Sequence, residues 1–241
     1  MLISQRGSTE VDYNTVVAVP VPERTESWRP ISNAVLIQEV KNQAGIHLLG
    51  YRLMSEDYCL ARGGDQMFGV ITYGYDEAGP YEPIGLSIGI RNSYNRTLSA
   101  GIALGAKVTV CSNLMFVGDV ITFRRHTKFA GMDLTDVVAK TLLQADSVYA
   151  EIEKFRARLR RRNVMDVHAF ASLGKAYGFG ILTESQMPIA KREWLEPSFD
   201  EFRDGGKTAW RLYNAMTFAL KSAPIPNRME RLAKLHEMFG G

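Results

Sequence analysis

The stretch 84-IGLSIGIRNSYNRTLSAGIALGAKVTVC-111 sets two apolar runs on either side of a polar turn. The surrounding region, from Ile46 to His126, continues in the same way, with short apolar runs separated by glycine and polar residues. This pattern is typical of a mostly antiparallel sheet. We predict about six strands, at residues 46–54, 58–62, 67–75, 84–91, 106–111 and 119–126. Residues 63–65, Gly-Gly-Asp, are predicted to form a hairpin loop, since glycine tolerates positive φ.

The apolar pattern changes from period two to period 3.6 after Gly131 and stays helical to the last residues. A long helix is predicted to begin at Asp133 or Thr135, and its apolar stripe extends as far as Leu159. Three further helices are predicted, at residues 165–177, 208–221 and 227–239. Residues 131–241 are therefore expected to be helical throughout.

The first 30 residues are predicted to form an arm. Val16 to Val21 is a β-prone run followed by prolines, which remove donors from a β-ladder, so we interpret it as an edge strand leading into a loop. Such an arm is able to add a strand to a neighbouring subunit. Ser32, a favourable N-cap residue, then precedes a helix-length apolar pattern that ends near Gly45.

These elements divide the chain into an arm at residues 1–30, a mainly β core at 31–130 and a helical region at 131–241. Because strands and helices are segregated along the chain, we expect an α+β fold rather than a doubly wound sheet. One helix is expected before the sheet, and the later helices are expected to pack on it. We expect the three segments to form one compact unit.

The composition indicates a globular protein. The chain has 241 residues, of which 46% are hydrophobic, enough to bury a sizeable core. Neither end carries the run of about 18 apolar residues that a membrane span requires, and the first residues are too polar for a secretory leader. We therefore expect a cytoplasmic protein without a membrane partner. Cys59 and Cys111 lack the paired spacing of zinc or redox motifs, so we interpret them as buried free thiols and expect no metal or cofactor.

Polar side chains follow three of the predicted strands, as Arg91-Asn92-Ser93, as Cys111-Ser112-Asn113 and as Arg124-Arg125-His126-Thr127. Strand ends are places where loops deliver functional side chains from a rigid scaffold. If the three ends converge, they form a pocket of guanidinium, amide, hydroxyl and imidazole groups. Such a pocket suits phosphate, because none of the three motifs contains a carboxylate. The alternative to a phosphate pocket is that these side chains have only structural roles. Asparagine and serine are common turn formers, and a single histidine often serves only as a hydrogen-bonded structural residue.

A dense basic cluster extends from Lys154 to Arg162, and no acidic residue interrupts it after Glu153. Two interpretations stay open. The cluster neutralises phosphates of a nucleic acid, or it is a solvated helix end whose arginines complement the helix dipole. The neighbouring aromatic residues are able to stack on bases, but their spacing favours buried helix faces; they are Phe155, Phe170, Tyr177 and Phe179.

Residues 85–127, GLSIGIRNSYNRTLSAGIALGAKVTVCSNLMFVGDVITFRRHT, resemble the core of the phage/plasmid-like family called domain of unknown function 932. The segments 28-WRPISNAVLI-37, 67-MFGVI-71 and 208-TAWRLYNAMTFAL-220 resemble flanking parts of that family. The resemblance covers most of the chain from Trp28 onward. It implies a phage or plasmid setting in a bacterial cell, next to replication and recombination functions, and it brings no established activity.

Two positions depart from the family pattern. Tyr94-Asn95 and Ser112 stand where relatives frequently carry aspartate. Both changes remove a carboxylate, which weakens a metal-dependent or acid/base mechanism at these positions. The common enzyme signatures are also missing: the sequence has no phosphate loop, no nucleophile elbow and no zinc-binding His-Glu-x-x-His helix.

We expect a nucleic-acid-associated protein without catalytic turnover, which binds or anneals single-stranded DNA as a homo-oligomer. Its nucleic-acid or phosphate contacts are predicted to be Arg91, Asn92, Ser93, Asn113, Arg124, Arg125, Thr127, Arg158, Arg160, Arg161 and Arg162. Two alternatives stay open. The first is an enzyme acting on a nucleotide or nucleic acid, with His126 as the candidate catalytic acid or base. The second is a module that binds a host protein, which predicts an exposed apolar patch.

Overall fold

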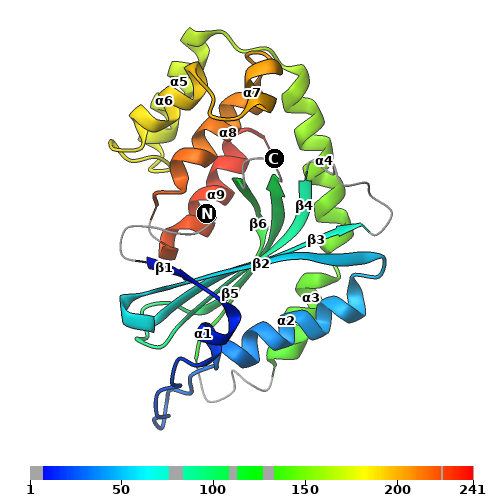
Figure 1. Ribbon diagram of the computed structural model, residues 1–241, viewed down its shortest axis with the longest axis vertical. Helices are drawn as coiled ribbons and strands as arrows, with labels where there is room; N and C mark the ends of the chain where they lie inside the picture. Colours follow the sequence, from blue (N-terminus) through cyan, green and yellow to red (C-terminus); the bar gives the residue numbers. More distant parts are fainter. Residues whose placement is uncertain (1–7, 76–83, 109–112, 127–132, 224, 241) are drawn as a thin grey trace.

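The computed structural model describes residues 8–75, 84–108, 113–126, 133–223 and 225–240, and Figure 1 shows their arrangement. One sheet contains six strands in the order in which they follow in the chain, and every neighbouring pair is antiparallel. The strands are β1 (Ser8–Val11), β2 (Tyr51–Ala61), β3 (Gln66–Tyr75), β4 (Ile84–Ser93), β5 (Ala100–Val108) and β6 (Asn113–Arg124). The predicted α+β class with a mostly antiparallel sheet is confirmed.

The strand boundaries differ from the prediction in three places. Residues 51–54 and 58–61 of the two predicted strands, 46–54 and 58–62, belong to one strand, β2, because a register shift between Leu53 and Ser55 lets it pair with β3 along its whole length, whereas residues 46 and 47 are helical. The predicted loop at residues 63–65 does join β2 to β3, and Gly63 and Gly64 have φ of 68° and 102°. β5 begins earlier than predicted, at Ala100, and β6 begins at Asn113 rather than at residue 119; residues 109–111 lie outside the described residues.

One face of the sheet packs against helices α2 (Asn33–His47) and α3 (Leu134–Leu142), which lie below the sheet in Figure 1. Side chains alternate along a strand, so Leu86, Ile88 and Ile90 of β4 share this face, and all three are fully buried. Ile102 and Leu104 of β5 pair with them across the ladder. This layer is the apolar core that the sequence pattern around residues 84–111 predicts.

The opposite face of β4 and β5 is built from small residues. Gly85, Ser87 and Gly89 of β4 alternate with the large apolar residues; Ser87 and Gly89 pair with Gly105 and Ala103 of β5, and Gly85 pairs with Lys107. Helix α9 (Ile225–Met238) covers this side of the sheet, since it contacts β6 and its Glu230 pairs with Arg91.

The helical layer above the sheet contains α4 (Ala145–Arg161), α5 (Asp166–Gly178), α6 (Met187–Leu195), α7 (Asp200–Asp204) and α8 (Ala209–Leu220). Helix α8 is buried on all sides except at Phe218, because α4, α6, α9 and β6 surround it. Its N-cap residue Thr208 accepts a hydrogen bond from the backbone N–H of Arg211 at 3.3 Å. The predictions of α5, α8 and α9 are confirmed within two residues at each end, whereas α6 and α7 were not predicted.

The prediction of one long helix from residue 133 onward is wrong, because the segment forms two helices: α3 ends at Leu142 and α4 begins at Ala145. The apolar spacing runs through the break, which is why the sequence pattern does not reveal it. Figure 1 shows the reason for the break, because α3 lies under the sheet whereas α4 rises past the sheet edge into the helical layer. One straight helix does not reach both places.

The prediction of a strand at Val16 to Val21 is also wrong. Helix α1 (Tyr13–Val17) occupies this part, and the side chain of Asp12 caps it by accepting a hydrogen bond from the backbone N–H of Thr15 at 2.7 Å. Val16 is fully buried in the core of its own chain, so it is not available to a neighbouring subunit. The edge strand of the N-terminal segment is β1, which pairs with β2. A capping residue and burial here override β-propensity.

Two further predictions concern single features. Cys59 is a free and fully buried thiol in β2, as expected, and Cys111 lies outside the described residues. Within the described ranges, no helix has both the length and the apolar character needed to cross a membrane.

Candidate functional site

The end of β4 serves the fold rather than a ligand. Arg91 is 6% exposed, and its guanidinium pairs with the carboxylate of Glu230 at 2.5 Å. The amide of Asn92 is fully buried and donates 2.8 Å hydrogen bonds to the backbone carbonyl of Ile31 and to the side-chain oxygen of Asn33. The hydroxyl of Ser93 bonds to the backbone of the loop that follows β4. The prediction that these three residues contact phosphate therefore needs correction, because internal partners hold them.

His126 is likewise held by the backbone. Its Nδ1 accepts a hydrogen bond from the backbone N–H of Ile31 at 2.9 Å, and its carbonyl accepts one from the N–H of Arg29 at 3.1 Å. The side chain is buried, and this burial lowers the pKa of the imidazole below its ordinary value. The buried ring, whose Nδ1 accepts a hydrogen bond, ties down the segment before α2. The structure gives His126 a structural position and does not support the catalytic one.

The three strand ends do not converge. β4 ends and β6 ends at the same edge of the sheet, but Asn113 stands at the start of β6, where it pairs with Val108. The intervening length of β5, from Ala100 to Val108, places Asn113 roughly 25 Å from that edge. Thr127 and the side chain of Asn113 lie outside the described residues. A single pocket formed by all three predicted motifs is therefore excluded by the antiparallel order of the strands.

The two arginines that follow β6 differ. Arg124 forms a bidentate pair with Asp133, with N–O distances of 2.9 and 2.8 Å, and so anchors the start of α3 to the sheet. Arg125 is exposed. Of the predicted strand-end contacts that the structure describes, only Arg125 presents an exposed cation.

Some side chains of the basic cluster at the end of α4 have partners within the chain, and others are exposed. Arg158 donates hydrogen bonds to the backbone carbonyls of Phe239 and Gly240, and Arg160 lies 3.8 Å from the carboxylate of Glu201. Arg161 and Arg162 are exposed, and neither forms an ion pair within the described part of the chain. Among the described residues of the cluster, these two arginines and the exposed Lys154 remain free to meet an external anion.

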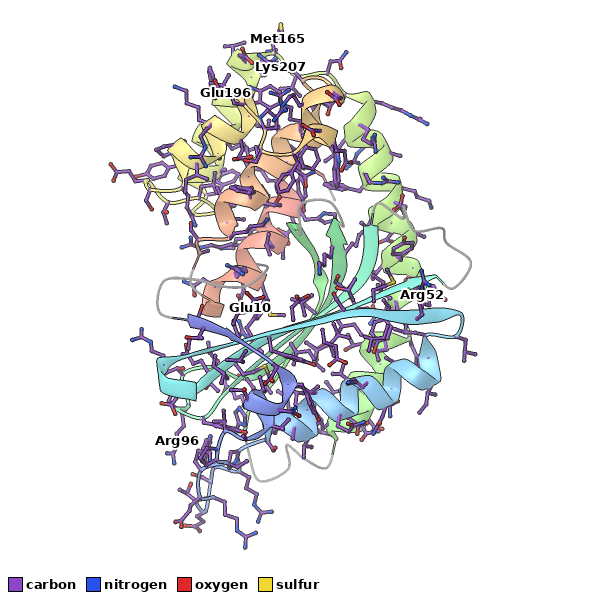
Figure 2. The ribbon with its side chains drawn as sticks, viewed as in Figure 1. Glu10, Arg52, Arg96, Met165, Glu196 and Lys207 are labelled. Carbon is purple, nitrogen blue, oxygen red and sulfur yellow. The ribbon has the colours of Figure 1, made fainter. Side chains whose placement is uncertain are left out.

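Helix α5 brings further functional side chains to the end of α4. Its start is fixed by Asp166, whose carboxylate accepts hydrogen bonds from Lys207 at 2.6 Å and from the indole N–H of Trp194 at 3.0 Å. The bonds from Lys207 are the main cause of a lowered pKa at Asp166. Figure 2 shows Lys207 and Met165 at the end of the helical layer farthest from the sheet. The orientation of α5 is thus set by a defined polar anchor.

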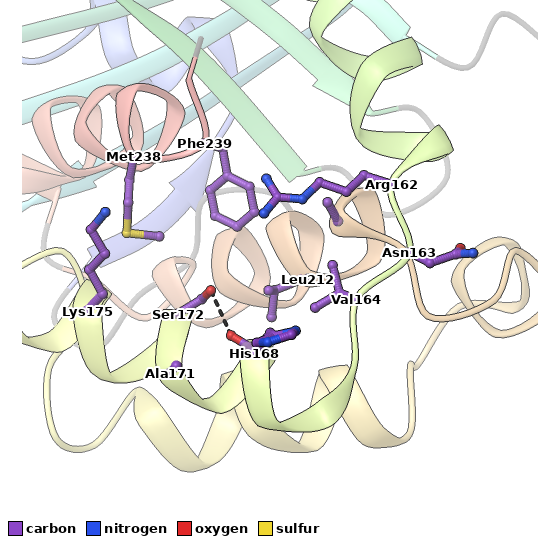
Figure 3. Close-up of a pocket in the computed structure, with 11 residues that line it drawn as sticks. Arg162, Asn163, Val164, His168, Ala171, Ser172, Lys175, Leu212, Met238 and Phe239 are labelled. Carbon is purple, nitrogen blue, oxygen red and sulfur yellow. Dashed lines mark hydrogen bonds between the residues drawn. The ribbon is translucent and has the colours of Figure 1, made fainter.

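A cavity of about 500 Å³ lies beside α5, and we call it the α5 cavity. Figure 3 shows Arg162 reaching into it from the end of α4, opposite Lys175 of α5, with Phe239 between them. Among the described residues, the lining contains these two cations, one histidine and no carboxylate. The lining residues are Arg162, Asn163, Val164, His168, Ala171, Ser172, Lys175, Ala209, Leu212, Met238 and Phe239. The cavity is therefore an electropositive site with an apolar back wall.

An exposed aromatic ring lies close to Lys175, which lines the cavity. The side chain of Phe179 is 59% exposed, and the ammonium of Lys175 lies 5.4 Å from the centre of its ring. We call Arg161, Arg162, Lys175 and Phe179 the basic flank of α5. The expectation that residues 170, 177 and 179 are core aromatics is wrong, since all three are at least 40% exposed, whereas Phe155 is buried.

Charge is concentrated in this part of the chain. Residues 154–192 contain nine lysines and arginines against two acidic residues, so they carry a formal charge of +7. The rest of the chain carries −4, which makes the net charge of +3 a poor guide to the surface. A local excess of cations raises the concentration of anionic partners and speeds their association.

Two residues of the candidate site were missed by sequence reasoning. Lys175 and His168 were not singled out, although their spacing of seven places them on one side of α5. The sequence of α5 has apolar or small residues on two sides of the helix, and only one of these sides, with Ala169 and Leu173, packs into the core. Comparisons of the chain with family models, with curated proteins and with solved structures found no match.

Proposed function

We propose that the protein binds single-stranded nucleic acid along the basic flank of α5. The observation that carries this proposal is the combination of exposed, unpaired cations and an exposed aromatic ring beside a cavity whose described lining has no carboxylate. Cations neutralise phosphates, and an aromatic face stacks on bases, which are accessible only in single strands. In the phage or plasmid setting that the family resemblance implies, this activity would serve replication or recombination.

Salt dependence tests the proposal. If Arg161, Arg162 and Lys175 each neutralise one phosphate, the logarithm of the affinity should fall with the logarithm of the salt concentration with a slope of about −2. Replacing Arg161→Glu and Arg162→Glu together should weaken binding to a labelled single-stranded oligonucleotide and reduce the slope to about −0.7 or less. Fluorescence anisotropy across a salt series measures both quantities.

A matched control separates site-specific contacts from the change in net charge. Arg24 and Arg52 are exposed and lie outside the helical layer, and Figure 2 shows Arg52 beside the sheet. Replacing both with glutamate changes the net charge by the same amount as the test pair. The proposal expects the control pair to keep most of the affinity. Equal losses in the two variants, or no binding by the natural sequence at low salt, would contradict it.

A second candidate function, protein binding, is favoured by the other exposed side of α5. Val167, Phe170, Gly174 and Tyr177 follow the spacing of one helix face, and the side chains of Val167 and Tyr177 are 65% and 53% exposed. This spacing is that of a helix-packing seam, and the space in front of Gly174 is open. We call these four residues the apolar stripe and propose that a second copy of the chain packs on it.

The mass in solution tests this second proposal. Light scattering behind size-exclusion chromatography should find an oligomer, and Phe170→Lys should shift it to the mass of one chain, about 27.0 kDa. An oligomer whose mass does not respond to Phe170→Lys would show that the copies assemble elsewhere. If the natural protein is a monomer, the proposal that a second copy packs on the apolar stripe fails. The stripe would then be a surface for a different protein partner, as in the host-binding alternative.

A further inference from the structure

The polar wall of the α5 cavity belongs to one helix. His168, Ser172 and Lys175 are spaced by four and three residues, so they line the same side of α5. The hydroxyl of Ser172 donates to the carbonyl of His168 at 2.9 Å, as the dashed line in Figure 3 shows, and it retains its acceptor positions for a ligand. The imidazole of His168 is exposed at the same wall. This wall therefore offers a cation, an imidazole and a hydroxyl within two turns of a helix.

The opposite wall is apolar and rigid. Leu212 of α8 is 2% exposed, and Met238 and Phe239 pack against the core. The ring of Phe239 meets that of Tyr213 edge to face, with centroids 5.3 Å apart and planes at 86°. This contact holds the Phe239 ring in place, so a flat ligand is offered a preformed surface. Arg162 closes the space from the end of α4, on the side opposite Lys175.

The two walls together select a class of ligand. A volume of about 500 Å³ falls within the range of small-molecule pockets, about 300 to 1,000 Å³. Inorganic phosphate would pair with a cation of the cavity but would leave the apolar wall unused. A purely apolar ligand would desolvate both cations without compensation, which is unfavourable. A molecule with an anionic end and a flat aromatic end uses both walls.

We propose that the α5 cavity is a subsite for one nucleotide unit. Its phosphate lies at Lys175 and Ser172 on the α5 wall, its base lies against Phe239 and Met238, and Arg162 faces it from the opposite side. The inference rests on the proposed function in that the nucleotide belongs to the bound strand, which places one base in the cavity. The rest of the strand then continues over Phe179 and the exposed arginines.

Mononucleotide titration tests the subsite. The probes are deoxyadenosine monophosphate, deoxyadenosine and inorganic phosphate, each measured by isothermal titration calorimetry with the whole chain. The nucleotide should bind. Deoxyadenosine, which lacks the phosphate, and inorganic phosphate, which lacks the base, should each bind at least about tenfold more weakly. Equal affinity for phosphate and nucleotide would overturn the proposal, and so would no binding of the nucleotide.

Two variants locate the nucleotide. Lys175→Gln removes a cation from the cavity wall and should weaken nucleotide binding by about tenfold. Lys191→Gln is the matched control, since Lys191 is an exposed lysine of the same helical layer that lies 5.6 Å from the ring of Phe170 and not at the cavity. Equal effects of the two changes would overturn the placement. Both side chains are exposed, and circular dichroism verifies that the two variants keep the fold.

Strand binding by the same samples separates the two proposals. If the single-stranded oligonucleotide binds and deoxyadenosine monophosphate does not, the proposed function stands and the nucleotide subsite is refuted. If the mononucleotide binds and the strand does not, the proposed function fails, and the claim that the nucleotide belongs to a strand fails with it. If both bind and Lys175→Gln weakens both, the subsite is confirmed.

Discussion

Two exposed phenylalanines on α5 and its C-terminal end allow the stacking contribution to be isolated. Phe179 is 59% exposed with Lys175 at 5.4 Å, and Phe170 is 40% exposed with Lys191 at 5.6 Å. The two rings therefore have similar exposure and similar lysine neighbours. They differ in position, because Phe179 belongs to the basic flank and Phe170 to the apolar stripe. We predict that Phe179→Leu weakens binding of single-stranded DNA and that Phe170→Leu does not.

The expected magnitude follows from the removal of a π-face without loss of charge. Stacking of one base on an aromatic ring contributes about 1 to 3 kcal/mol, so Phe179→Leu should raise the dissociation constant by about 5- to 150-fold. Leucine retains most of the apolar contact, so the free energy of unfolding should change by less than about 1.5 kcal/mol. Because no cation is lost, the salt slope of binding should be the same as for the natural sequence.

Anisotropy titrations at three salt concentrations measure the dissociation constant and the slope together. Phe179→Tyr keeps an aromatic ring and should keep the affinity. The reasoning would be refuted if Phe179→Leu and Phe170→Leu changed the affinity equally, or if Phe179→Tyr lost as much affinity as Phe179→Leu. A change in slope for Phe179→Leu would show that the ring positions a cation rather than stacking on a base.

Three further predictions concern stability. Burial, with a smaller contribution from a nearby arginine, lowers the pKa of His236 from 6.5 to about 4. On mild acidification the His236 imidazole therefore takes up a proton in the unfolded chain but not in the folded one. The free energy of unfolding should therefore fall by about 3 kcal/mol as the pH drops from about 6.5 to about 4, and urea unfolding of His236→Phe should lack the early part of this loss, above about pH 5. Gly69→Ala should destabilise the fold by about 1 to 3 kcal/mol in thermal unfolding, because its Cβ would meet the ring of Tyr58 at 2.7 Å, whereas Gly174→Ala, with open space, should be neutral or stabilising. Asn92→Ala should reduce stability by about 1 to 3 kcal/mol because buried acceptors lose their donor, and should leave nucleic-acid affinity unchanged; a reversed pattern would restore a binding role for Asn92.

The sheet was predictable because its signal is local. Alternating apolar and small residues on β4 mark a strand with two different faces, and the Gly-Gly loop after β2 marks a hairpin. The N-terminal segment was not predictable from propensity, since Val16 has a strong β-preference but follows Asp12, which caps a helix. The break between α3 and α4 depends on where each helix packs, and the apolar spacing of the sequence does not contain that information.

The candidate site was predictable only in part. Arg161 and Arg162 stood out because basic residues are consecutive there, and the structure leaves both exposed. The partner of Arg91 is Glu230, 139 residues later, so no local pattern marks that arginine as an internal ion pair. Phe179 was assigned to the core because both sides of α5 satisfy the period of an amphipathic helix. Only tertiary packing decides which side faces solvent.

Cross-linking of a bound strand tests the central claim most directly. A single-stranded oligonucleotide containing 5-bromouracil is irradiated with the protein at low salt, and the cross-linked peptides are mapped by mass spectrometry. We predict that the cross-links fall within residues 158–179 and at Phe239, and that they disappear in the Arg161→Glu, Arg162→Glu variant. Cross-links concentrated around Arg24 or Arg52, or no cross-linked peptide at all, would contradict a nucleic-acid interface on the basic flank of α5.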